Sequence, residues 1–142
     1  MDKHLQTGQI GEELACRYLE EQGYRLLERN WRHEHKEIDL IAQWGATLCI
    51  IEVKTRSAGS YQKARESVTR DKQAFLIQAA DAYVREQRLS LEVRYDIIAL
   101  QIAADGSYSL EHIEQAFVPT LRTLRSSAKH PRGRRIVTAA KS

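Results

Sequence analysis

The sequence predicts a single α/β domain in which helices flank a mixed β-sheet. Three observations indicate this fold class: an amphipathic segment near the N-terminus, three consecutive segments with alternating apolar residues, and a second amphipathic segment followed by two more strand-like segments. The expected element order is therefore αβββαββ. The chain has 142 residues, of which 42% are hydrophobic, and this is enough to bury a core without disulfides or a structural metal.

The first helix is expected over residues 7–22, and Gly23 follows its last turn as a C-terminal cap. Gly11 lies at the centre of the apolar face, where the missing side chain permits close approach to a sheet. Glu12 lies at the edge of this face, whereas Glu13 points to solvent. If one of these acids enters a site at the helix–sheet junction, it is Glu12. The apolar half of the helix contains Ile10, Leu14, Ala15, Tyr18 and Leu19.

Three strand-like segments follow the first helix, and their apolar and polar residues alternate. Short turns separate the segments, so we expect them to pair as an antiparallel meander. They cover residues 24–31, 37–44 and 47–56.

A second helix begins with Thr69 or Ser67 as its cap and ends near residue 88. It is long enough to cross over the sheet and to place the next strand parallel to an earlier one. Asp105-Gly106 then predicts a hairpin. The two strands after this helix cover residues 93–102 and 108–113.

The charge is divided unevenly along the chain. Residues 119–142 hold 7 of the 22 Lys and Arg residues and no Asp or Glu, so the first 118 residues keep 15 basic against 19 acidic side chains. We therefore expect a domain over residues 1–118 and a basic, flexible tail over residues 119–142. Such a tail attracts phosphate backbones without sequence preference, and a solvated terminus with no partner is an equally good interpretation.

Neither a membrane span nor a signal peptide is expected. No apolar run approaches the roughly 20 residues that a membrane span needs, and residues 1–6 have no apolar stretch. Cys16 and Cys49 lie outside any Cys-x-x-Cys pair and are expected to be small buried hydrophobic residues. The resulting expectation is a cytoplasmic protein without disulfides.

The turn between the second and third strands sets the register of the predicted site. If Gly45-Ala46 forms a two-residue hairpin loop, Asp39 lies directly opposite Glu52. Two carboxylates placed in this way have Cβ atoms about 5 Å apart and repel each other. A positive group between them would relieve the repulsion, and a divalent metal and Lys54 are the candidates.

The same register places Glu37 opposite Lys54, so four charged residues share one face at the end of the hairpin. The opposite face is continuously apolar, and we expect it to be core. Its residues are Ile38, Leu40, Cys49, Ile51 and Val53.

Carboxylates of this kind are ligands for a hard cation. Asp39 and Glu52 would bind Mg²⁺ or Mn²⁺ directly, and the backbone carbonyl of Val53 would be a third ligand. Lys54 would orient or deprotonate an attacking water, or stabilise negative charge on a phosphate. From the residues alone, an alternative stays open, in which the two acids form surface ion pairs with Lys36 and Lys54.

The charged group lies within a longer series of motifs. In chain order these are Gly8-Gln9-Ile10-Gly11-Glu12, Gly23-Tyr24, Asn30-Trp31-Arg32, Glu37-Ile38-Asp39-Leu40-Ile41, Glu52-Val53-Lys54-Thr55-Arg56, Lys72-Gln73 and Arg94-Tyr95-Asp96. The series resembles the YraN-type family of uncharacterised bacterial proteins, within the PD-(D/E)XK nuclease-like superfamily. The resemblance implies a restriction-endonuclease-like fold, similar to that of Holliday-junction resolvases.

The same resemblance implies an activity and a set of roles. The activity is metal-dependent, Mg²⁺ or Mn²⁺, hydrolysis of phosphodiester bonds in DNA. Asp39, Glu52 and Lys54 would carry the superfamily motif, with Glu12 as the helix acid. The chain departs from the family pattern at Lys36, where a glycine is usual.

Further residues are expected to contact a nucleic-acid backbone. Lys72 and Gln73 open the second helix, where backbone N–H groups bind phosphate, and Arg56 flanks the loop before it. A capped, solvated first turn is the alternative for the helix residues. Asp96 is expected to make structural hydrogen bonds or an ion pair with Arg94, and none of the five histidines has the spacing of metal ligands.

Two other functions stay open. The first is a nucleic-acid-binding or adaptor module on a nuclease-like fold without turnover, and the second is a protein-interaction domain. A homodimer is an open alternative to a monomer, because the sequence does not determine the oligomeric state.

Overall fold

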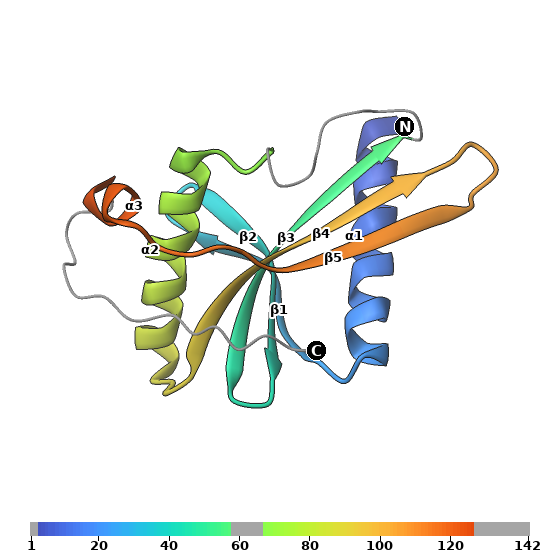
Figure 1. Ribbon diagram of the computed structural model, residues 1–142. Helices are drawn as coiled ribbons and strands as arrows, with labels where there is room; N and C mark the ends of the chain where they lie inside the picture. Colours follow the sequence, from blue (N-terminus) through green and yellow to red (C-terminus); the bar gives the residue numbers. More distant parts are fainter. Residues whose placement is uncertain (1–2, 58–66, 127–142) are drawn as a thin grey trace.

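The computed structural model describes residues 3–57 and 67–126, and within these ranges the expected order of helices and strands is confirmed (Figure 1). One short helix follows the last strand. The elements are α1 (Lys3–Glu21), β1 (Arg25–His33), β2 (Lys36–Trp44), β3 (Thr47–Ser57), α2 (Arg70–Gln87), β4 (Glu92–Ile102), β5 (Tyr108–Phe117) and α3 (Leu121–Ser126).

One mixed sheet contains the five strands in the order β1-β2-β3-β4-β5. β1, β2 and β3 form the expected antiparallel meander, and α2 carries the chain across so that β4 pairs parallel with β3. β5 returns antiparallel to β4. In the turn between them the N–H of Ala103 donates to the carbonyl of Ser107 at 2.8 Å, and Gly106 has a φ of 91°.

The hairpin register predicted from Gly45-Ala46 is confirmed near the turn. Trp44 pairs with Thr47, and the register continues without a shift to the pair of Leu40 and Ile51. The glycine of the turn has a φ of 61°, a conformation that other residues seldom adopt. Local turn chemistry is therefore sufficient to align these two strands.

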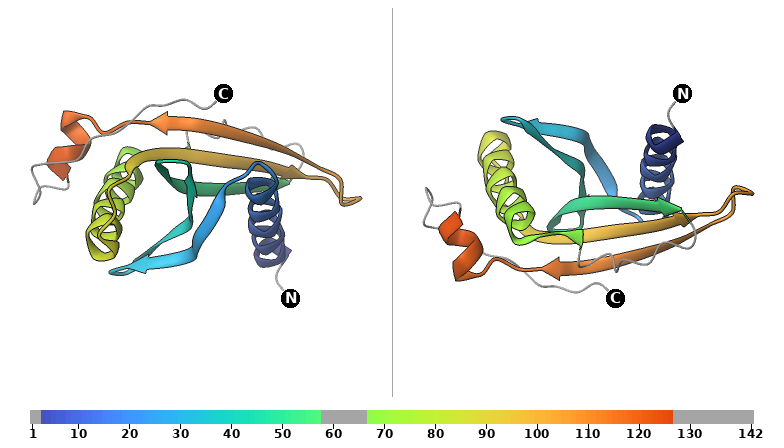
Figure 2. Two further views of the ribbon diagram at one scale, coloured as in Figure 1. Left: turned by 90° about the horizontal axis from the view of Figure 1, so that it is seen from below. Right: turned by 90° about the horizontal axis from the view of Figure 1, so that it is seen from above.

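The two long helices lie on opposite sides of the β1–β2 part of the twisted sheet, as the two views of Figure 2 show. Each helix covers its own core, so both faces of β3 are buried. Cys16 and Cys49 are buried on the α1 side, as expected. The other apolar residues predicted to be core are also buried, with Val53 only partly so: Ile38, Leu40, Ile51 and Val53.

Helix α1 approaches the sheet most closely at Gly11. A Cβ atom at this position would collide with the hydroxyl group of Thr55 on β3, so the predicted close approach is confirmed. The buried stripe continues through Ala15 and Leu19. Ile10 was expected on the same half of the helix but is 49% exposed, because the contact with the sheet is centred on Gly11, one position further round.

The C-terminal part of the described chain is more ordered than expected. β5 continues to Phe117, whose ring stacks on Tyr95 with 5.0 Å between centroids. α3 lies within the segment predicted to be a tail, and its Leu124 packs against the α2-side core. Residues 127–142 lie outside the described ranges, so a flexible basic tail stays a prediction for them.

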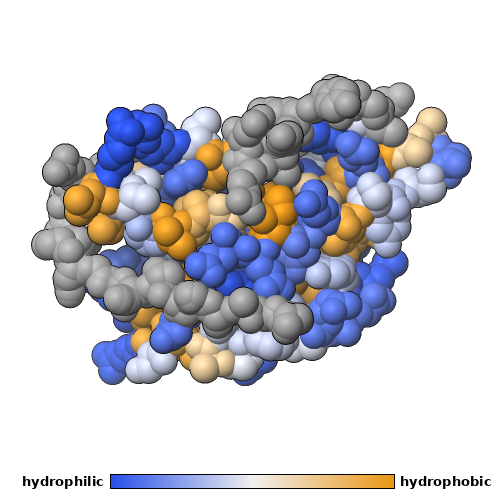
Figure 3. Space-filling view, viewed as in Figure 1, coloured by the Kyte–Doolittle hydropathy of each residue, from blue (hydrophilic) through white to orange (hydrophobic). Residues whose placement is uncertain are grey.

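No helix in residues 3–57 and 67–126 is long and apolar enough to cross a membrane. On the face of the molecule seen in Figure 1, the coloured surface of Figure 3 shows hydrophobic residues scattered among hydrophilic ones. Leu121 is a large hydrophobic residue with 72% exposure. Single exposed apolar residues of this kind are normal on a protein surface.

Candidate functional site

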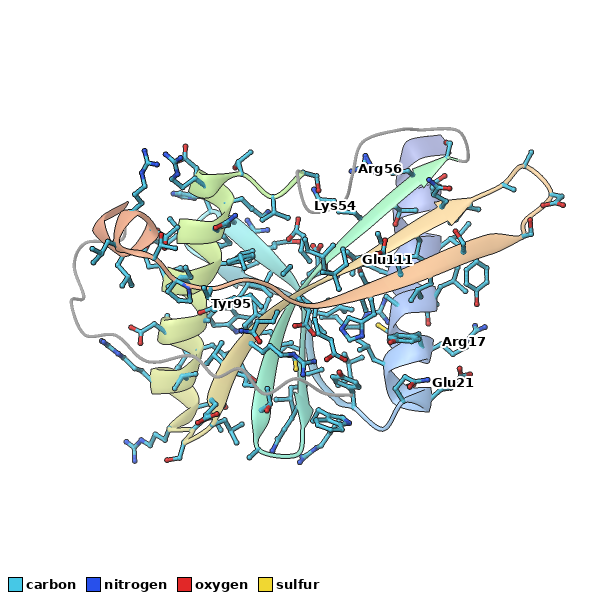
Figure 4. The ribbon with its side chains drawn as sticks, viewed as in Figure 1. Arg17, Glu21, Lys54, Arg56, Tyr95 and Glu111 are labelled. Atoms are coloured by element: carbon cyan, nitrogen blue, oxygen red, sulfur yellow. The ribbon has the colours of Figure 1, made fainter. Side chains whose placement is uncertain are left out.

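Five of the eight predicted site residues gather at one end of the sheet. The C-terminal end of β3 lies there, at the same end of the molecule as the first turns of α1 and α2 (Figure 1), and Figure 4 places Lys54 and Arg56 on this part of β3. An open hollow of about 720 Å³ is lined by residues of α1, β1, β2 and β3, including Glu12, Asp39 and Val53 together with these two basic residues. This hollow is the candidate site.

Asp39 lies where β2 and β3 separate. The ladder between the two strands ends at the pair of Leu40 and Ile51, so the expected ladder pair of Asp39 with Glu52 is not formed. Instead, Oδ2 of Asp39 accepts the backbone N–H of Val53 at 2.8 Å. The carboxylate thus occupies the position that a β2 carbonyl would hold in a continuing ladder.

Glu52 is buried beside this point, with only 5% of its surface exposed. Two ammonium groups approach its Oε2: Nζ of Lys54 at 3.5 Å and Nζ of Lys72 at 3.6 Å. Its other oxygen, Oε1, is buried and has no hydrogen-bond partner among the described residues. Because an unpaired buried polar atom is costly, this atom needs an explanation, and a bound ion or water is the usual one.

Burial raises the pKa of Asp39 from 3.8 to about 7. The negative charges of Glu52 and Glu12 contribute to this rise after burial, while the Val53 N–H and Lys72 oppose it. Asp39 therefore gains and loses its proton near neutral pH. Carboxyl groups with such shifts gather at functional sites, and a bound cation would lower the pKa again.

Glu12 reaches the hollow from α1, and its side chain is 21% exposed. Its Oε1 accepts a hydrogen bond from Nδ2 of Asn30 at 3.2 Å and lies 3.8 Å from Nη2 of Arg29. Asn30 has a φ of 52°, which asparagine tolerates better than most residues. Glu13 is 60% exposed, so the predicted difference between the two helix acids is confirmed.

The expected pairing of Glu37 with Lys54 is wrong. Oε2 of Glu37 lies 2.9 Å from Nη1 of Arg32, which is its cross-strand partner on β1. The physical reason is the separation of β2 from β3 beyond Leu40, after which the hairpin register no longer determines which side chains meet. Lys54 therefore pairs with Glu52 on its own strand.

The start of α2 differs in detail from the predicted phosphate-binding turn. Thr69 is the N-cap, as expected, and its Oγ1 accepts the N–H of Lys72 at 3.2 Å. Nε2 of Gln73 donates to the carbonyl of Val68 at 3.2 Å and so closes the same turn. The ammonium of Lys72 is directed to Glu52, and no local pattern in the sequence could have indicated that contact.

The donor atoms of the site fit a hard divalent cation. Asp39 and Oε1 of Glu52 offer carboxylate oxygens. The carbonyl of Val53 faces the same side as its N–H, which points to Asp39. No three His, Cys, Asp or Glu side chains within the described ranges converge as a ready-made metal cage. Mg²⁺ commonly takes only one or two carboxylates and keeps several waters, so such a donor set suits it better than zinc.

A second polar cluster lies buried between α1 and the sheet. Asp96 accepts hydrogen bonds from Nε and Nη2 of Arg94 at 2.9 and 2.8 Å, as expected for an ion pair. Nε2 of His112 also contacts Asp96 at 2.8 Å, and its Nδ1 lies 2.8 Å from the hydroxyl of Tyr18. Arg94 donates in addition to the hydroxyl of Tyr24 at 2.7 Å. The sequence interpretation placed His112 within a strand but gave it no role, because both of its partners are distant in the chain.

Comparison with known proteins shows a family match that includes the residues of the site. The uncharacterised protein family UPF0102 matches residues 11–100, a range that contains the eight predicted site residues. A UPF0102 protein of Bacteroides thetaiotaomicron is 40% identical over 121 residues, covering 85% of this chain and 99% of that protein. UPF0102 proteins of Porphyromonas gingivalis (37% over 137 residues; 96% and 100% covered) and Chlorobium chlorochromatii (41% over 117 residues; 79% and 91% covered) are also similar. These names give a family and no activity.

Proposed function

We propose a function for this chain, which belongs to the uncharacterised protein family UPF0102, from the chemistry of its site. The function is metal-dependent hydrolysis of phosphodiester bonds in DNA, on a restriction-endonuclease-like fold of the PD-(D/E)XK kind. The observation that carries the proposal is the buried Oε1 of Glu52, which has no partner among the described residues and lies near Asp39, whose pKa is raised to about 7. Two acids so placed favour a divalent cation.

Each site residue has a role in this proposal. Asp39, Glu52 and the Val53 carbonyl would hold Mg²⁺ or Mn²⁺, which would lower the pKa of a bound water and neutralise charge on the phosphate. Lys54, whose side chain is 30% exposed beside the hollow, would orient or deprotonate the attacking water. Glu12 lines the same hollow from α1 and would accept a hydrogen bond from that water.

Basic residues near the hollow would hold the DNA backbone. Arg56 lines the hollow, and Lys72 lies at the capped start of α2. Gln73 was included with them in the sequence interpretation, but its amide donates to Val68, so its share in DNA binding would require that bond to open. Such contacts position the backbone without reading sequence.

A cleavage panel tests the proposal. The full chain is incubated with single-stranded, duplex, flap and four-way-junction DNA, in Mg²⁺, Mn²⁺ or EDTA. We expect cleavage that requires the metal and that falls by about 10²-fold or more in Asp39→Asn and in Glu52→Gln. Glu13→Gln is the matched control, because this exposed acid lies one position from Glu12. Full activity in both site variants would contradict the proposal.

A second candidate function is favoured by one specific observation. The acids are already partly neutralised by the chain itself: Oε2 of Glu52 by two lysines and Oδ2 of Asp39 by the Val53 N–H. This arrangement also suits a nucleic-acid-binding or adaptor module without turnover. DNA binding that weakens steeply with salt, together with no cleavage in any metal, would identify this function.

A further inference from the structure

Two lysines from different elements share one carboxylate oxygen. Lys54 reaches Oε2 of Glu52 along β3, and Lys72 reaches it from the first turn of α2. Both ammonium groups lie on the same oxygen, and this leaves Oε1 without a partner among the described residues. The proposed catalytic motif requires only one lysine, so the second calls for an explanation.

Lys72 acts on the whole acidic pair. Its positive charge lowers the pKa of Asp39, although burial dominates the shift, and the same ammonium contacts Glu52. A divalent cation at these two carboxylates would stand within a few ångströms of this ammonium, and like charges at that distance repel. The cation and the Lys72 ammonium therefore compete for the same acids.

The Lys72 ammonium can also occupy positions away from Glu52. The lysine side chain is 34% exposed, and its Nζ lies 5.9 Å from the centroid of the Phe75 ring, whose face is a second favourable position for the ammonium. Four rotatable bonds allow the ammonium to leave Glu52 without any movement of α2, whose first turn is held by the Thr69 cap. A displaced ammonium at a helix start is well placed for a phosphate oxygen.

We infer that Lys72 is a positioning residue that holds the place of the divalent cation at Glu52 and, when the cation binds, transfers its ammonium to a phosphate oxygen of the DNA. The inference rests on the proposed function and goes beyond it in linking its two ligands. Cation binding frees the cationic group that DNA needs, so each ligand increases the affinity of the site for the other.

The test measures Mn²⁺ and DNA binding separately, on the full chain. Mn²⁺ is titrated by calorimetry, and binding of a fluorescent four-way DNA junction is followed by anisotropy with and without Mn²⁺, with a gel to verify that the DNA stays intact. Lys72→Met keeps a long, unbranched apolar side chain and removes the charge. Lys36→Met is the matched control, because Lys36 is exposed and its Nζ lies 5.5 Å from the centroid of the same Phe75 ring.

In the unsubstituted chain we expect Mn²⁺ to tighten DNA binding by about tenfold. In Lys72→Met we expect Mn²⁺ to bind several-fold more tightly and DNA binding to lose its response to Mn²⁺. Lys72→Arg should keep that response. Lys36→Met should leave both properties within about twofold. If Lys72 had a merely structural role, its loss would weaken the binding of both ligands. It would not tighten Mn²⁺ binding while abolishing the effect of Mn²⁺ on DNA binding.

The outcomes separate this inference from the function on which it rests. If the unsubstituted chain binds no Mn²⁺, the proposed metal-dependent function and the inference both fail. If Mn²⁺ binds and Lys72→Met leaves its affinity unchanged or lowers it, only the inference fails. Lys72→Gln provides a second neutral variant, so a folding defect in one substitution does not decide the result.

Discussion

Asp39, which is partly buried, and Asp96, which is fully buried, lie on neighbouring parts of one sheet, yet the structure shifts their pKa values in opposite directions. Asp39 accepts a hydrogen bond from the Val53 N–H and has a second acid beside it, and its pKa rises to about 7. Asp96 is 1% exposed, and burial alone would raise its pKa, but hydrogen bonds from His112, Arg94 and the Gln115 N–H hold it below 3.8.

The difference shows that burial does not by itself decide the state of a carboxyl group. The Asp96 cluster supplies donors for the charged form and so stabilises one arrangement of α1, β4 and β5. The hollow at Asp39 supplies too few donors for its acids, and Oε1 of Glu52 has no partner among the described residues. In the Asp96 cluster the carboxylate is satisfied, and among the described residues the buried polar atom without a hydrogen bond there is Nη1 of Arg94, which lies 3.8 Å from Oε1 of Glu114. In the hollow the atom without a described partner is a carboxylate oxygen, and that is where a cation is expected.

The largest effect is expected in the Asp96 cluster. Arg94→Met would leave the buried Asp96 without its bidentate partner, at a cost of about 3–5 kcal/mol in the free energy of unfolding. Urea denaturation at pH 7.5 measures this. Lys54→Met is the matched change in the hollow and should cost no more than about 1 kcal/mol, because Lys54 is partly exposed. Similar losses of unfolding free energy in the two variants would contradict the difference between the Asp96 cluster and the hollow.

The close approach of α1 to β3, next to the hollow, can be tested at Gly11. Gly11→Ala places a methyl group against the Thr55 hydroxyl, and we expect a loss of about 1–3 kcal/mol in unfolding free energy from overpacking. Gly8→Ala is the control on the same helix, since nothing lies within 4 Å of its added Cβ, and it should be neutral or stabilising. Thr55→Ala should rescue part of the loss. A Gly11→Ala protein as stable as the Gly8→Ala protein would exclude the close approach.

The opposite pKa shifts predict opposite effects of two Asp→Asn changes. Because the folded-state pKa of Asp39 is raised, its contribution to stability is fully present below pH 3.8 and is lost as the pH rises through about 7. Asp39→Asn removes this loss, so we expect it to be more stable than the unsubstituted protein by about 1–2 kcal/mol at pH 8, with a difference that shrinks toward pH 4.

Asp96→Asn is the control for this pH dependence. The folded-state pKa of Asp96 is lowered, so its stabilising contribution is present above pH 3.8 and is lost only as the pH falls through the folded-state pKa. Asp96→Asn should therefore be less stable than the unsubstituted protein throughout pH 5–8. Thermal unfolding of both variants across this range measures the two trends. If both substitutions raised stability at pH 8, or both lowered it, the opposite pKa shifts of Asp39 and Asp96 would be contradicted.

The smallest effect is expected at the start of α2. Thr69→Ala removes the oxygen that accepts the Lys72 N–H and should cost about 1 kcal/mol in unfolding free energy. Thr69→Ser keeps the acceptor and should cost less than half of that. Amide hydrogen exchange at Lys72 should quicken in the first variant only. Unchanged exchange in both would show that the cap does not order the turn that positions Lys72.

Much of the fold follows from local patterns. Alternating residues predicted the strands, helical spacing predicted the two long helices, and the turn at Gly45-Ala46 set a register that the structure keeps as far as Leu40 and Ile51. The short α3 and the last residues of β5 were missed. Their sequences are mixed in polarity, and Leu124 and Phe117 are fixed by packing on distant elements.

The site was predictable in its composition and only partly in its contacts. Glu12 and Asp39 meet at the hollow as expected, and Glu52 lies buried beside it. Glu37 instead pairs with Arg32, because the hairpin register stops where β2 and β3 separate. No sequence signal marks where two twisted strands diverge.

The sequence by itself determined the order of elements, the hairpin register and the charged residues available at the end of β3. These depend on short-range physics: side-chain period, turn conformation and helix caps. Tertiary structure alone decided that Lys72 would contact Glu52 and that His112 would contact Asp96. Both contacts depend on how α2 and β5 return to a twisted sheet, and that geometry results from long-range packing of apolar faces rather than from any local pattern.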